Sequence, residues 1–473
     1  MNRADAVGQI AQTLQAIAAS LPELVAGVGK VMKVEKGAIS ALFEAHSDIL
    51  AGRARTLFTK EPITVAWIEG MAAGDVLYDV GANVGMYSVW AAKHSVKVYA
   101  FEPMAENYAQ LTRNLAINGI TDPAYCLAIT ARQSVDRLHL STEEVGHSCH
   151  SYGEAVGPNL QPRTGPTQGC VGMSIDELVK AGLPVPNHIK IDVDGFEWRV
   201  IKGAAQTLKR PEVKTVLVEL SPSLVSHQGV LDYFATHGWY CDPVQVKRAT
   251  RKAGEWKGYA EHLFHRLSPV AHYTLERIRQ AEVRTEPFPH IYVEQVFEPA
   301  LYEHILTQMP TEYVPIEQAR GVSGYPDRFV ASPRTTFWRD FERFLRCGAI
   351  RTALCAKFGV AGDDDEMLLI RDKPGYSIGP HTDSVKKALS ALFYLPKDDA
   401  LAQHGTSLYT PKATGFTCAG HKHHHFEDFD CVATMPFKPN SLFAFPKSDR
   451  SFHGVEAFTG AGVRDVLLYD VRA

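Results

Sequence analysis

The spacing of apolar and polar positions changes twice along the chain, and each change marks a different predicted domain. From residue 5 to residue 52, apolar side chains recur at seven-residue intervals, as from Val7 to Val28, with further apolar residues between them. This repeat is typical of a helix that buries one stripe of its surface. We therefore predict an N-terminal helical segment over residues 1–52. It either packs as a helical hairpin on the next domain or joins copies of the chain into a homo-oligomer.

Residues 75–220 show a different pattern, in which short β-rich runs alternate with helical segments. The runs are VLYDV, VKVYAFE, HIKIDVD and KTVLVEL. Runs that are apolar on both faces and separated by helices indicate a parallel, doubly wound sheet. We predict an α/β domain over residues 53–268.

The pattern changes again near Pro287. A charged stretch over residues 269–285 predicts a linker helix, and the runs LSALFYLP, GTSLYTP, SLFAFPKS and VRDVLLYDV follow it. These β-rich runs are separated by glycine and proline, which is typical of an antiparallel double-sheet domain. We predict such a domain over residues 286–473.

Composition narrows the class of protein. The chain has 473 residues, 45% of them hydrophobic, and a formal net charge of −4. This charge does not favour nucleic-acid binding. The eight cysteines form no CxxC pair, which argues against a zinc ribbon or a dithiol redox site and suggests a reducing cytoplasm. The sequence has no apolar run of membrane-spanning length and no signal-peptide pattern.

A glycine turn after the first β-rich run predicts a nucleotide site. VLYDVGANVGMYS places Gly81 and Gly85 between a strand and a helix, and Asp79 ends the strand. A carboxylate at that position would repel a pyrophosphate but suits an ammonium or a hydroxyl group. The next run ends at Glu102, where an acidic side chain accepts hydrogen bonds from ribose hydroxyls. A ligand with a ribose, no phosphate and a cationic amino-acid part fits, and S-adenosylmethionine is such a ligand.

The motifs of this half resemble the FkbM-type methyltransferase family. They are YDVGANVG, AFEP, IKIDVDGFE and VLVEL, in that order, and the resemblance covers roughly residues 50–268. It implies a Rossmann-like fold and S-adenosylmethionine-dependent O-methylation of sugars or natural-product hydroxyls. Gly81, Asn83, Gly85 and Glu102 match the cofactor motif.

Three carboxylates are candidates for the methyl-transfer chemistry. Asp192, Asp194 and Glu197 follow the HIKI run, at the sheet edge where ligands bind in such folds. Deprotonating an alcohol requires a base or a metal ion, and one of these side chains could serve. Alternatively, Glu197 caps the following helix and Asp192 only orders the loop.

A second constellation lies in the C-terminal half. His381 and Asp383 are two residues apart, so on a strand they point to the same face. With the distant His453 they predict a two-histidine, one-carboxylate iron(II) site. If residues 453–471 form a hairpin, His453 and Arg464 share a face, roughly 13 Å apart at ~3.3 Å per residue. A metal bond, a short dicarboxylate and a guanidinium could span that gap, because arginine clamps carboxylates bidentately.

These residues resemble the prolyl-hydroxylase-like 2-oxoglutarate/iron(II) oxygenases. The motifs include PFPHIYVEQVF, PGYSIGPHTD, PNSLFAFPKS and SFHGV, and the resemblance covers about residues 287–473. It implies a double-stranded β-helix (jelly-roll) fold, the three iron ligands above, and Arg464 as the anchor of 2-oxoglutarate. Tyr376 matches a position that often contacts this co-substrate. Because Asp383 is present, the iron keeps its carboxylate ligand. Halogenation usually needs that position vacated for a halide, so hydroxylation is expected.

The histidine-rich stretch over residues 421–425 has two interpretations. Consecutive histidines cannot all face one ion, so we expect a polar lid over the oxygenase mouth more than a second metal site.

Together the patterns predict a bifunctional tailoring enzyme that acts on a saccharide, such as a cell-surface glycan or nucleotide sugar, or on a natural product. An alternative is that only one domain is active and the other is a binding or scaffold module. A third hypothesis is that the first half is a dehydrogenase, but the G-x-G-x-x-G fingerprint of dinucleotide binding is missing there.

Overall fold

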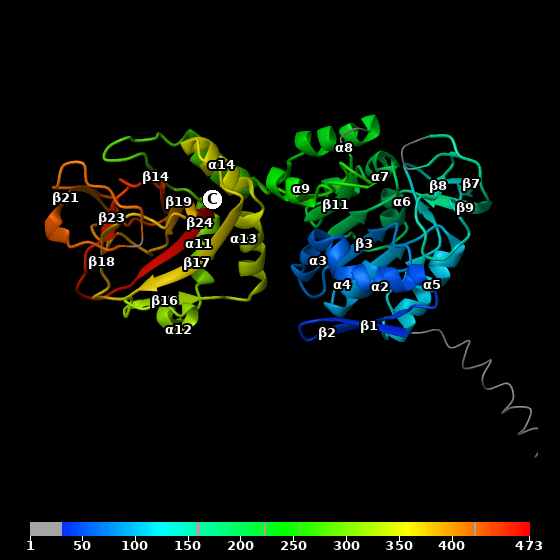
Figure 1. Cartoon of the computed structure of the whole chain (residues 1–473), viewed down its shortest axis with the longest axis horizontal. Helices are drawn as coiled ribbons and strands as arrows, with labels where there is room; N and C mark the ends of the chain where they lie inside the picture. Colours follow the sequence, from blue (N-terminus) through cyan, green and yellow to red (C-terminus); the bar gives the residue numbers. More distant parts are fainter. Residues whose placement is uncertain (1–30, 158–160, 222–223, 255, 421) are drawn as a thin grey trace, which may run out of the picture. The chain divides into compact units, whose positions relative to one another are not determined.

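The structure, a computed structural model, describes residues 31–157, 161–221, 224–254, 256–420 and 422–473, and these residues form two compact units (Figure 1). The first unit extends to His237 and resumes over Gln245–His265. The second contains Gly238–Val244 and Arg266–Ala473. Within the described ranges, no helix combines the length and the apolar character needed to cross a bilayer.

The first unit is an α/β fold. Its strands are β1 (Val31–Lys36), β2 (Ile39–Glu44), β3 (Val76–Val80), β4 (Lys97–Phe101), β5 (Ala124–Tyr125), β6 (Ala128–Ile129), β7 (Ser134–His139), β8 (Ser151–Tyr152), β9 (Thr167–Met173), β10 (His188–Ile191), β11 (Thr215–Leu220) and β13 (Ala260–Arg266). Its helices are α2 (Asp48–Lys60), α3 (Pro62–Glu69), α4 (Met86–Lys93), α5 (Ala105–Ile117), α6 (Ile175–Lys180), α7 (Glu197–Gly203), the 3-10 turn η1 (Thr207–Lys209), α8 (Val225–Thr236) and α9 (Pro243–Ala249).

The main sheet of this unit has the strand order β13-β11-β10-β3-β4-β5. Strands β3, β4, β5, β10 and β11 run parallel, and β13 pairs antiparallel with β11. The predicted parallel, doubly wound sheet is confirmed. The chain leaves β3 toward β4 on one side and returns to β10 on the other, so the order reverses beside β3. Ligands bind at such a reversal, outside the carboxyl ends of the strands.

The prediction of a helical segment over residues 1–52 is wrong for residues 31–44. These residues form the antiparallel hairpin β1–β2, and in the described part of the chain the first helix begins at Asp48. The cause is local: Gly37 adopts a positive φ of 59° at the turn, and Ala41 and Phe43 alternate into the core. The seven-residue repeat and its oligomer role lie on residues 1–30, outside the described chain, and stay a prediction.

The second unit is dominated by antiparallel strands. They are β12 (Trp239–Cys241), β14 (Ile291–Glu294), β15 (Val314–Pro315), β16 (Arg328–Ala331), β17 (Asp364–Asp372), β18 (Ile378–His381), β19 (Lys387–Tyr394), β20 (Ser407–Pro411), β21 (Phe429–Thr434), β22 (Ser441–Pro446), β23 (His453–Val455) and β24 (Arg464–Arg472). The helices are α10 (Pro269–Gln280), α11 (Pro299–Thr307), α12 (Ile316–Arg320), α13 (Thr336–Arg346), α14 (Ala349–Phe358) and the 3-10 turn η2 (Phe426–Asp428).

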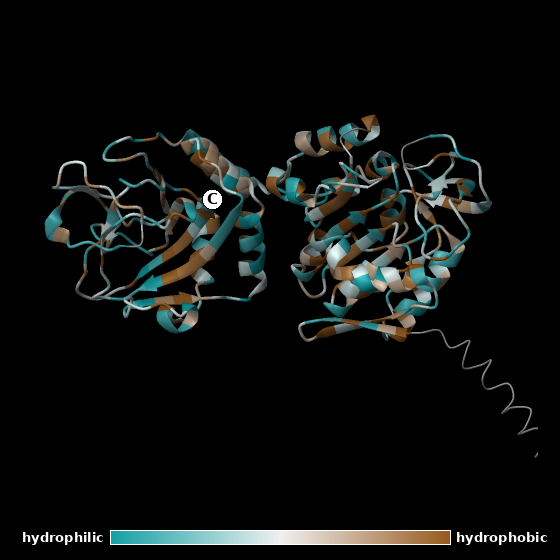
Figure 2. Cartoon of the chain, in the orientation of Figure 1, coloured by the Kyte–Doolittle hydropathy of each residue, from teal (hydrophilic) through white to brown (hydrophobic). Residues whose placement is uncertain are grey.

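Strands β14 to β24 form two sheets, as the sequence predicted, and β12 belongs to neither of them. The larger has the order β14-β22-β19-β24-β17-β16-β15, and the smaller has the order β18-β23-β20-β21. From β17 to β24 the chain passes repeatedly between them. Figure 2 shows hydrophobic residues along β17 and β24, in agreement with their buried positions.

The helix predicted as a linker over residues 269–285 is instead part of the second unit. Helix α10 buries Leu275 and Ile278 in the same apolar cluster as residues of β19 and β24. Its charged residues Glu276 and Arg279 are exposed, which is why the sequence looked like a solvent-exposed connection, whereas Arg277 is partly buried and donates to the Glu294 carbonyl at 2.7 Å.

The hairpin predicted over residues 453–471 is also wrong. Strand β23, with His453, pairs with β18 and β20 in the smaller sheet, whereas β24, with Arg464, pairs with β17 and β19 in the larger one. The residues between them cross from one sheet to the other, so the predicted register between His453 and Leu468 does not exist.

Candidate functional site

The glycine turn after β3 allows two segments of backbone to meet. Gly81 has φ 81°, and a Cβ atom added there would lie 1.9 Å from the carbonyl oxygen of Asp192. A side chain at Gly85, with φ 83°, would collide with Leu111. Gly81 is therefore required for the close approach of the ends of β3 and β10, and Gly85 for the packing of the turn against Leu111 of α5.

Glu102 holds this turn in place. Its Oε2 accepts a hydrogen bond from the Asn83 backbone N–H at 2.8 Å, and its Oε1 accepts one from the Met104 N–H at 2.9 Å. Burial raises the pKa of this carboxyl to about 7, although the two backbone hydrogen bonds oppose the shift. The side chain lies in the wall of a cavity with Gly81 and Asn83.

Asp79 is buried at the end of β3. One carboxylate oxygen accepts a hydrogen bond from the Ser88 hydroxyl at 2.6 Å, and the other has no partner among the described residues. A buried carboxylate oxygen without a donor is costly unless a ligand supplies one. Asp79 itself is not among the residues that line the cavity.

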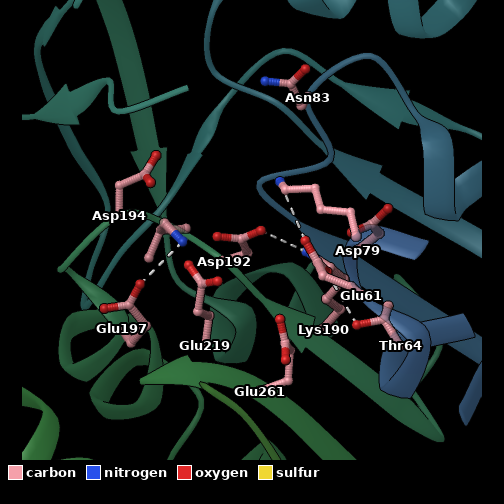
Figure 3. Close-up of polar contacts among 12 residues, drawn as sticks. Glu61, Thr64, Asp79, Asn83, Lys190, Asp192, Asp194, Glu197, Glu219 and Glu261 are labelled. Carbon is pink, nitrogen blue, oxygen red and sulfur yellow. Dashed lines mark hydrogen bonds and ion pairs between the residues drawn. The ribbon is translucent and has the colours of Figure 1, made fainter. Parts of the chain in front are cut away.

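The cavity continues to the ends of β10 and β11. Its walls include Arg53, Lys60, Gly81, Asn83, Glu102, His150, Asp192, Asp194, Arg199, Glu219, Arg251 and Trp256. Figure 3 shows the carboxylates at this edge of the sheet, with Asp192 between Asp194 and Lys190. The cavity is thus lined both by the glycine turn, through Gly81 and Asn83, and by the predicted acceptor-side aspartates, Asp192 and Asp194.

Asp192 and Asp194 have opposite electrostatic environments. Lys190 donates to Asp192 at 3.0 Å; burial opposes ionisation, but the lysine charge outweighs it and lowers the pKa of Asp192. Burial and the adjacent Asp192 charge raise the pKa of Asp194 to about 7, although its Oδ2 accepts a hydrogen bond from the Cys149 N–H at 2.7 Å. A carboxylate with this pKa is suited to accept a proton at neutral pH.

Glu197 is not placed to act as a base, which corrects one of the predicted catalytic candidates. Its Oε1 accepts from the backbone N–H groups of Val193 and Gly195, and its Oε2 lies 2.7 Å from His227 Nε2. Both oxygens are used in ordering the loop before α7. The predicted alternative, a cap of the following helix, is also wrong, because Phe196 is the N-cap residue and no side chain of the described residues caps this helix.

Sequence reasoning missed two further carboxylates of this site, Glu219 on β11 and Glu261 on β13. Arg251 is paired with Glu219 and lies 3.5 Å from Glu261. Burial raises the pKa of Glu261 to about 7 and also raises that of Glu219. Glu219 could have been found from the VLVEL run, because it is a charged residue near the end of a strand that is otherwise apolar. Glu261 becomes visible only through its pairing opposite Glu219 in the sheet.

In the second unit, the three predicted metal ligands converge. One ligand atom each from His381, Asp383 and His453 lies within 4.8 Å of the others. Strand pairing explains this, because His381 on β18 is opposite His453 on β23. Burial and the neighbouring His453 lower the pKa of His381 to about 3, so its imidazole is neutral and available for a metal bond.

A buried network holds the Asp383 carboxylate. Lys387 Nζ donates to Oδ1 at 3.0 Å and Ser390 Oγ donates to Oδ2 at 2.8 Å. Asp470 is 2.9 Å from the same lysine, and its Oδ1 lies 2.6 Å from the Ser390 hydroxyl, whose single hydrogen the two carboxylates share. This carboxylate is thus ionised and held in position, as a metal ligand requires.

Arg464 and Tyr376, the predicted co-substrate contacts, are both buried. Arg464 donates to Asp372 at 2.8 Å, while its Nε and the Tyr376 hydroxyl have no hydrogen-bond partner among the described residues. Unsatisfied buried donors of this kind fit a carboxylate ligand.

The histidine-rich stretch lies beside the triad. The ring centroid of His423 is 4.9 Å from that of His381 and 6.0 Å from that of Tyr325. His424 packs among Phe416, Phe429 and Phe452, and its backbone N–H donates to Pro380. This arrangement agrees with a cover over the triad more than with a second metal site.

Comparison with known proteins assigns the first unit to a class. The family described as Methyltransferase FkbM domain matches residues 79–240. Hexuronic acid methyltransferase AglP of Haloferax volcanii is 30% identical over 190 residues, which cover 40% of this chain and 74% of that protein. The 31-O-demethyl-FK506 methyltransferase FkbM of Streptomyces tacrolimicus is 25% identical over 171 residues, covering 31% of this chain and 65% of that protein.

Among solved structures, a Pseudomonas putida prolyl-4-hydroxylase is similar to 43% of this chain and to all of its own length, 100%, with 15% identity and a TM-score of 0.28.

The family match and the curated relative show that the first unit is a methyltransferase, and its doubly wound sheet agrees with that class. The chain belongs to the FkbM methyltransferase family.

Proposed function

We propose that the chain is a bifunctional tailoring enzyme, with an S-adenosylmethionine-dependent O-methyltransferase in the first unit and an iron(II)/2-oxoglutarate-dependent oxygenase in the second. The convergence of His381, Asp383 and His453 is the observation that carries the oxygenase assignment. The passage of the chain between two antiparallel sheets supports a double-stranded β-helix (jelly-roll) fold for this unit.

For the methyltransferase, the cavity wall offers separate contacts to the parts of S-adenosylmethionine. In this wall, Glu102 would accept hydrogen bonds from the ribose hydroxyls, and Gly81 allows close approach of the backbone. The buried Asp79 keeps one oxygen without a partner among the described residues for the ammonium group. The bound cofactor would supply a methyl group activated by a sulfonium. Asp194 would accept the proton from the acceptor hydroxyl, and Asp192, paired with Lys190, would stay ionised beside it.

For the oxygenase, His381, Asp383 and His453 would hold iron(II), and Arg464 with Tyr376 would bind 2-oxoglutarate. Bound iron and 2-oxoglutarate would supply oxygen activation. The protein would fix the metal's carboxylate ligand through Lys387 and Ser390.

The acceptor we propose is a saccharide or a hydroxylated natural product. One relative is named a hexuronic acid methyltransferase, and the cavity wall contains Arg53, Lys60, Arg199 and Trp256, side chains that bind carboxylates and stack on sugar rings. Incubation with glycans and nucleotide sugars, followed by mass spectrometry, tests this. A mass gain of about 14 units would mark methylation and about 16 units would mark hydroxylation.

Glu102→Ala is expected to weaken S-adenosylmethionine binding by about 1–3 kcal/mol, because the backbone donors of the turn and the ribose lose their acceptor. Isothermal titration calorimetry measures this change. Glu177→Ala, on helix α6, is the matched control and should bind normally. Equal affinity of Glu102→Ala and the wild type would refute the ribose assignment.

Each unit is expected to keep its own activity when expressed alone, provided that all of its elements are included. Fragments 1–265 and 238–473 overlap so that each retains its complete unit. A fragment 281–473 should be unstable, since it lacks Leu275 and Ile278, whose burial contributes about 1.5–3 kcal/mol each. Activity assays and thermal unfolding of the three fragments test this.

If the two complete fragments are inactive alone yet active when mixed, the units depend on each other. Independent activity would instead support fusion as a means of raising the local concentration of a shared substrate.

A further inference from the structure

Three charged side chains form a row across neighbouring strands of the larger sheet. The register pairs Arg328 on β16 with Asp372 on β17, and Asp372 with Arg464 on β24. Residues directly opposite in paired strands point to the same face. The three side chains therefore meet, and we call them the Arg328–Asp372–Arg464 row.

The central carboxylate is shared between the two arginines. Arg328 donates from Nε to Asp372 Oδ1 at 2.7 Å and from Nη2 to Oδ2 at 3.0 Å. Arg464 donates from Nη1 to Oδ2 at 2.8 Å. Arg328 thus makes the bidentate pair, and Arg464 makes a single contact with its remaining donors directed elsewhere.

The row carries an uncompensated positive charge in a buried place. It contains two cations and one anion, and Arg464 and Asp372 are 1% and 0% exposed at their side chains. The next row along the same strands is different: Arg371 and Asp465, on the opposite face, form a closed bidentate pair at 2.7 and 2.8 Å. Only the first of these two rows has charge left for a ligand.

Two buried donors mark where that ligand would bind. Arg464 Nε and the Tyr376 hydroxyl have no hydrogen-bond partner in the part of the chain that the structure describes. The guanidinium of Arg328 lies 4.1 Å from the Tyr376 ring centroid, so the same arginine also fixes the tyrosine. A carboxylate would satisfy both donors and neutralise the extra charge.

We propose that Arg328 and Asp372 are positioning residues for the distal carboxylate of 2-oxoglutarate, an inference that rests on the proposed oxygenase function. Asp372 fixes the Arg464 guanidinium, and Arg328 neutralises Asp372. The charge of Arg464 is thereby left for the co-substrate. If Arg328 were absent, Asp372 and 2-oxoglutarate would compete for the guanidinium of Arg464.

The test is a double-mutant cycle on the full-length protein. Binding of 2-oxoglutarate is measured by isothermal titration calorimetry in the presence of Mn(II), which needs no turnover. Arg328→Met is expected to raise the Kd of 2-oxoglutarate by about tenfold or more, because Asp372 then faces Arg464 alone. The double variant Arg328→Met/Asp372→Asn should return the Kd to within about threefold of the wild type, since the opposing charge is gone.

Matched controls separate charge from damage to the fold. Arg328→Lys keeps the cation and should bind with a Kd close to that of the wild type. Arg371→Met removes the arginine of the adjacent row on the opposite face, and its Kd should also be unchanged. If Arg328→Met does not fold, rescue by the double variant and the behaviour of Arg328→Lys still decide the question.

The outcomes are distinct. If the wild type with Mn(II) binds no 2-oxoglutarate, the proposed oxygenase function fails. If the wild type binds and Arg328→Met binds equally well, this inference alone is overturned. A double variant that is as weak as Arg328→Met, or weaker, would also overturn it, because the row would then be only a structural ion cluster.

Discussion

Asp383→Ala is expected to abolish iron-dependent formation of succinate from 2-oxoglutarate while leaving methyl transfer intact. The variant removes the single carboxylate of the triad and leaves Lys387 buried with only Asp470 as its ionic partner. Two neutral imidazoles alone bind a divalent metal weakly. Succinate measurement with added iron(II), together with Mn(II) titration of the protein, tests both the loss of activity and the loss of metal.

Asp399→Ala is the matched control, because Asp399 is exposed in the same unit. It should retain succinate formation and metal affinity. Normal turnover of 2-oxoglutarate by Asp383→Ala would show that the triad is misassigned, whereas loss of methyl transfer in that variant would show that the two units are not independent.

Asp194→Asn is expected to reduce methyl transfer by about two to four orders of magnitude, the usual contribution of a positioned general base. Binding of S-adenosylmethionine should change little, because Glu102, Asp79 and the glycine turn are untouched. The amide can still accept the Cys149 N–H, so the loop is preserved and only proton acceptance is lost. Initial rates with an acceptor that the wild type methylates, together with calorimetry of cofactor binding, separate the two effects.

The pH dependence of methyl transfer should follow the ionisation of Asp194. Its pKa is raised to about 7, and the deprotonated form is the active base, so the rate should rise between about pH 6 and pH 8. Asp232→Asn, an exposed substitution on α8, should leave this profile unchanged. A profile that is flat over this range in the wild type would argue against Asp194 as the base, and equally against Glu261, whose pKa is also raised to about 7.

Local sequence determined the parts of this protein that depend on backbone period and turn chemistry. Alternating strands and helices predicted the parallel sheet, and the spacing from Gly81 to Glu102 predicted two adjacent strand ends. His381 and Asp383 were predictable as a pair, because two residues of the same short segment are close in any fold. These features require few long-range contacts, so the sequence alone was enough to predict them.

Tertiary structure decided the rest, because strand pairing is a long-range choice that local sequence does not contain. His453 and Arg464 lie in different sheets, although their spacing suggested a hairpin. Glu197 looked like a candidate base, but the backbone of its own loop and His227 occupy both oxygens. Arg328 and Asp372 drew no attention in the sequence, and they became important only when the register of three strands placed them beside Arg464.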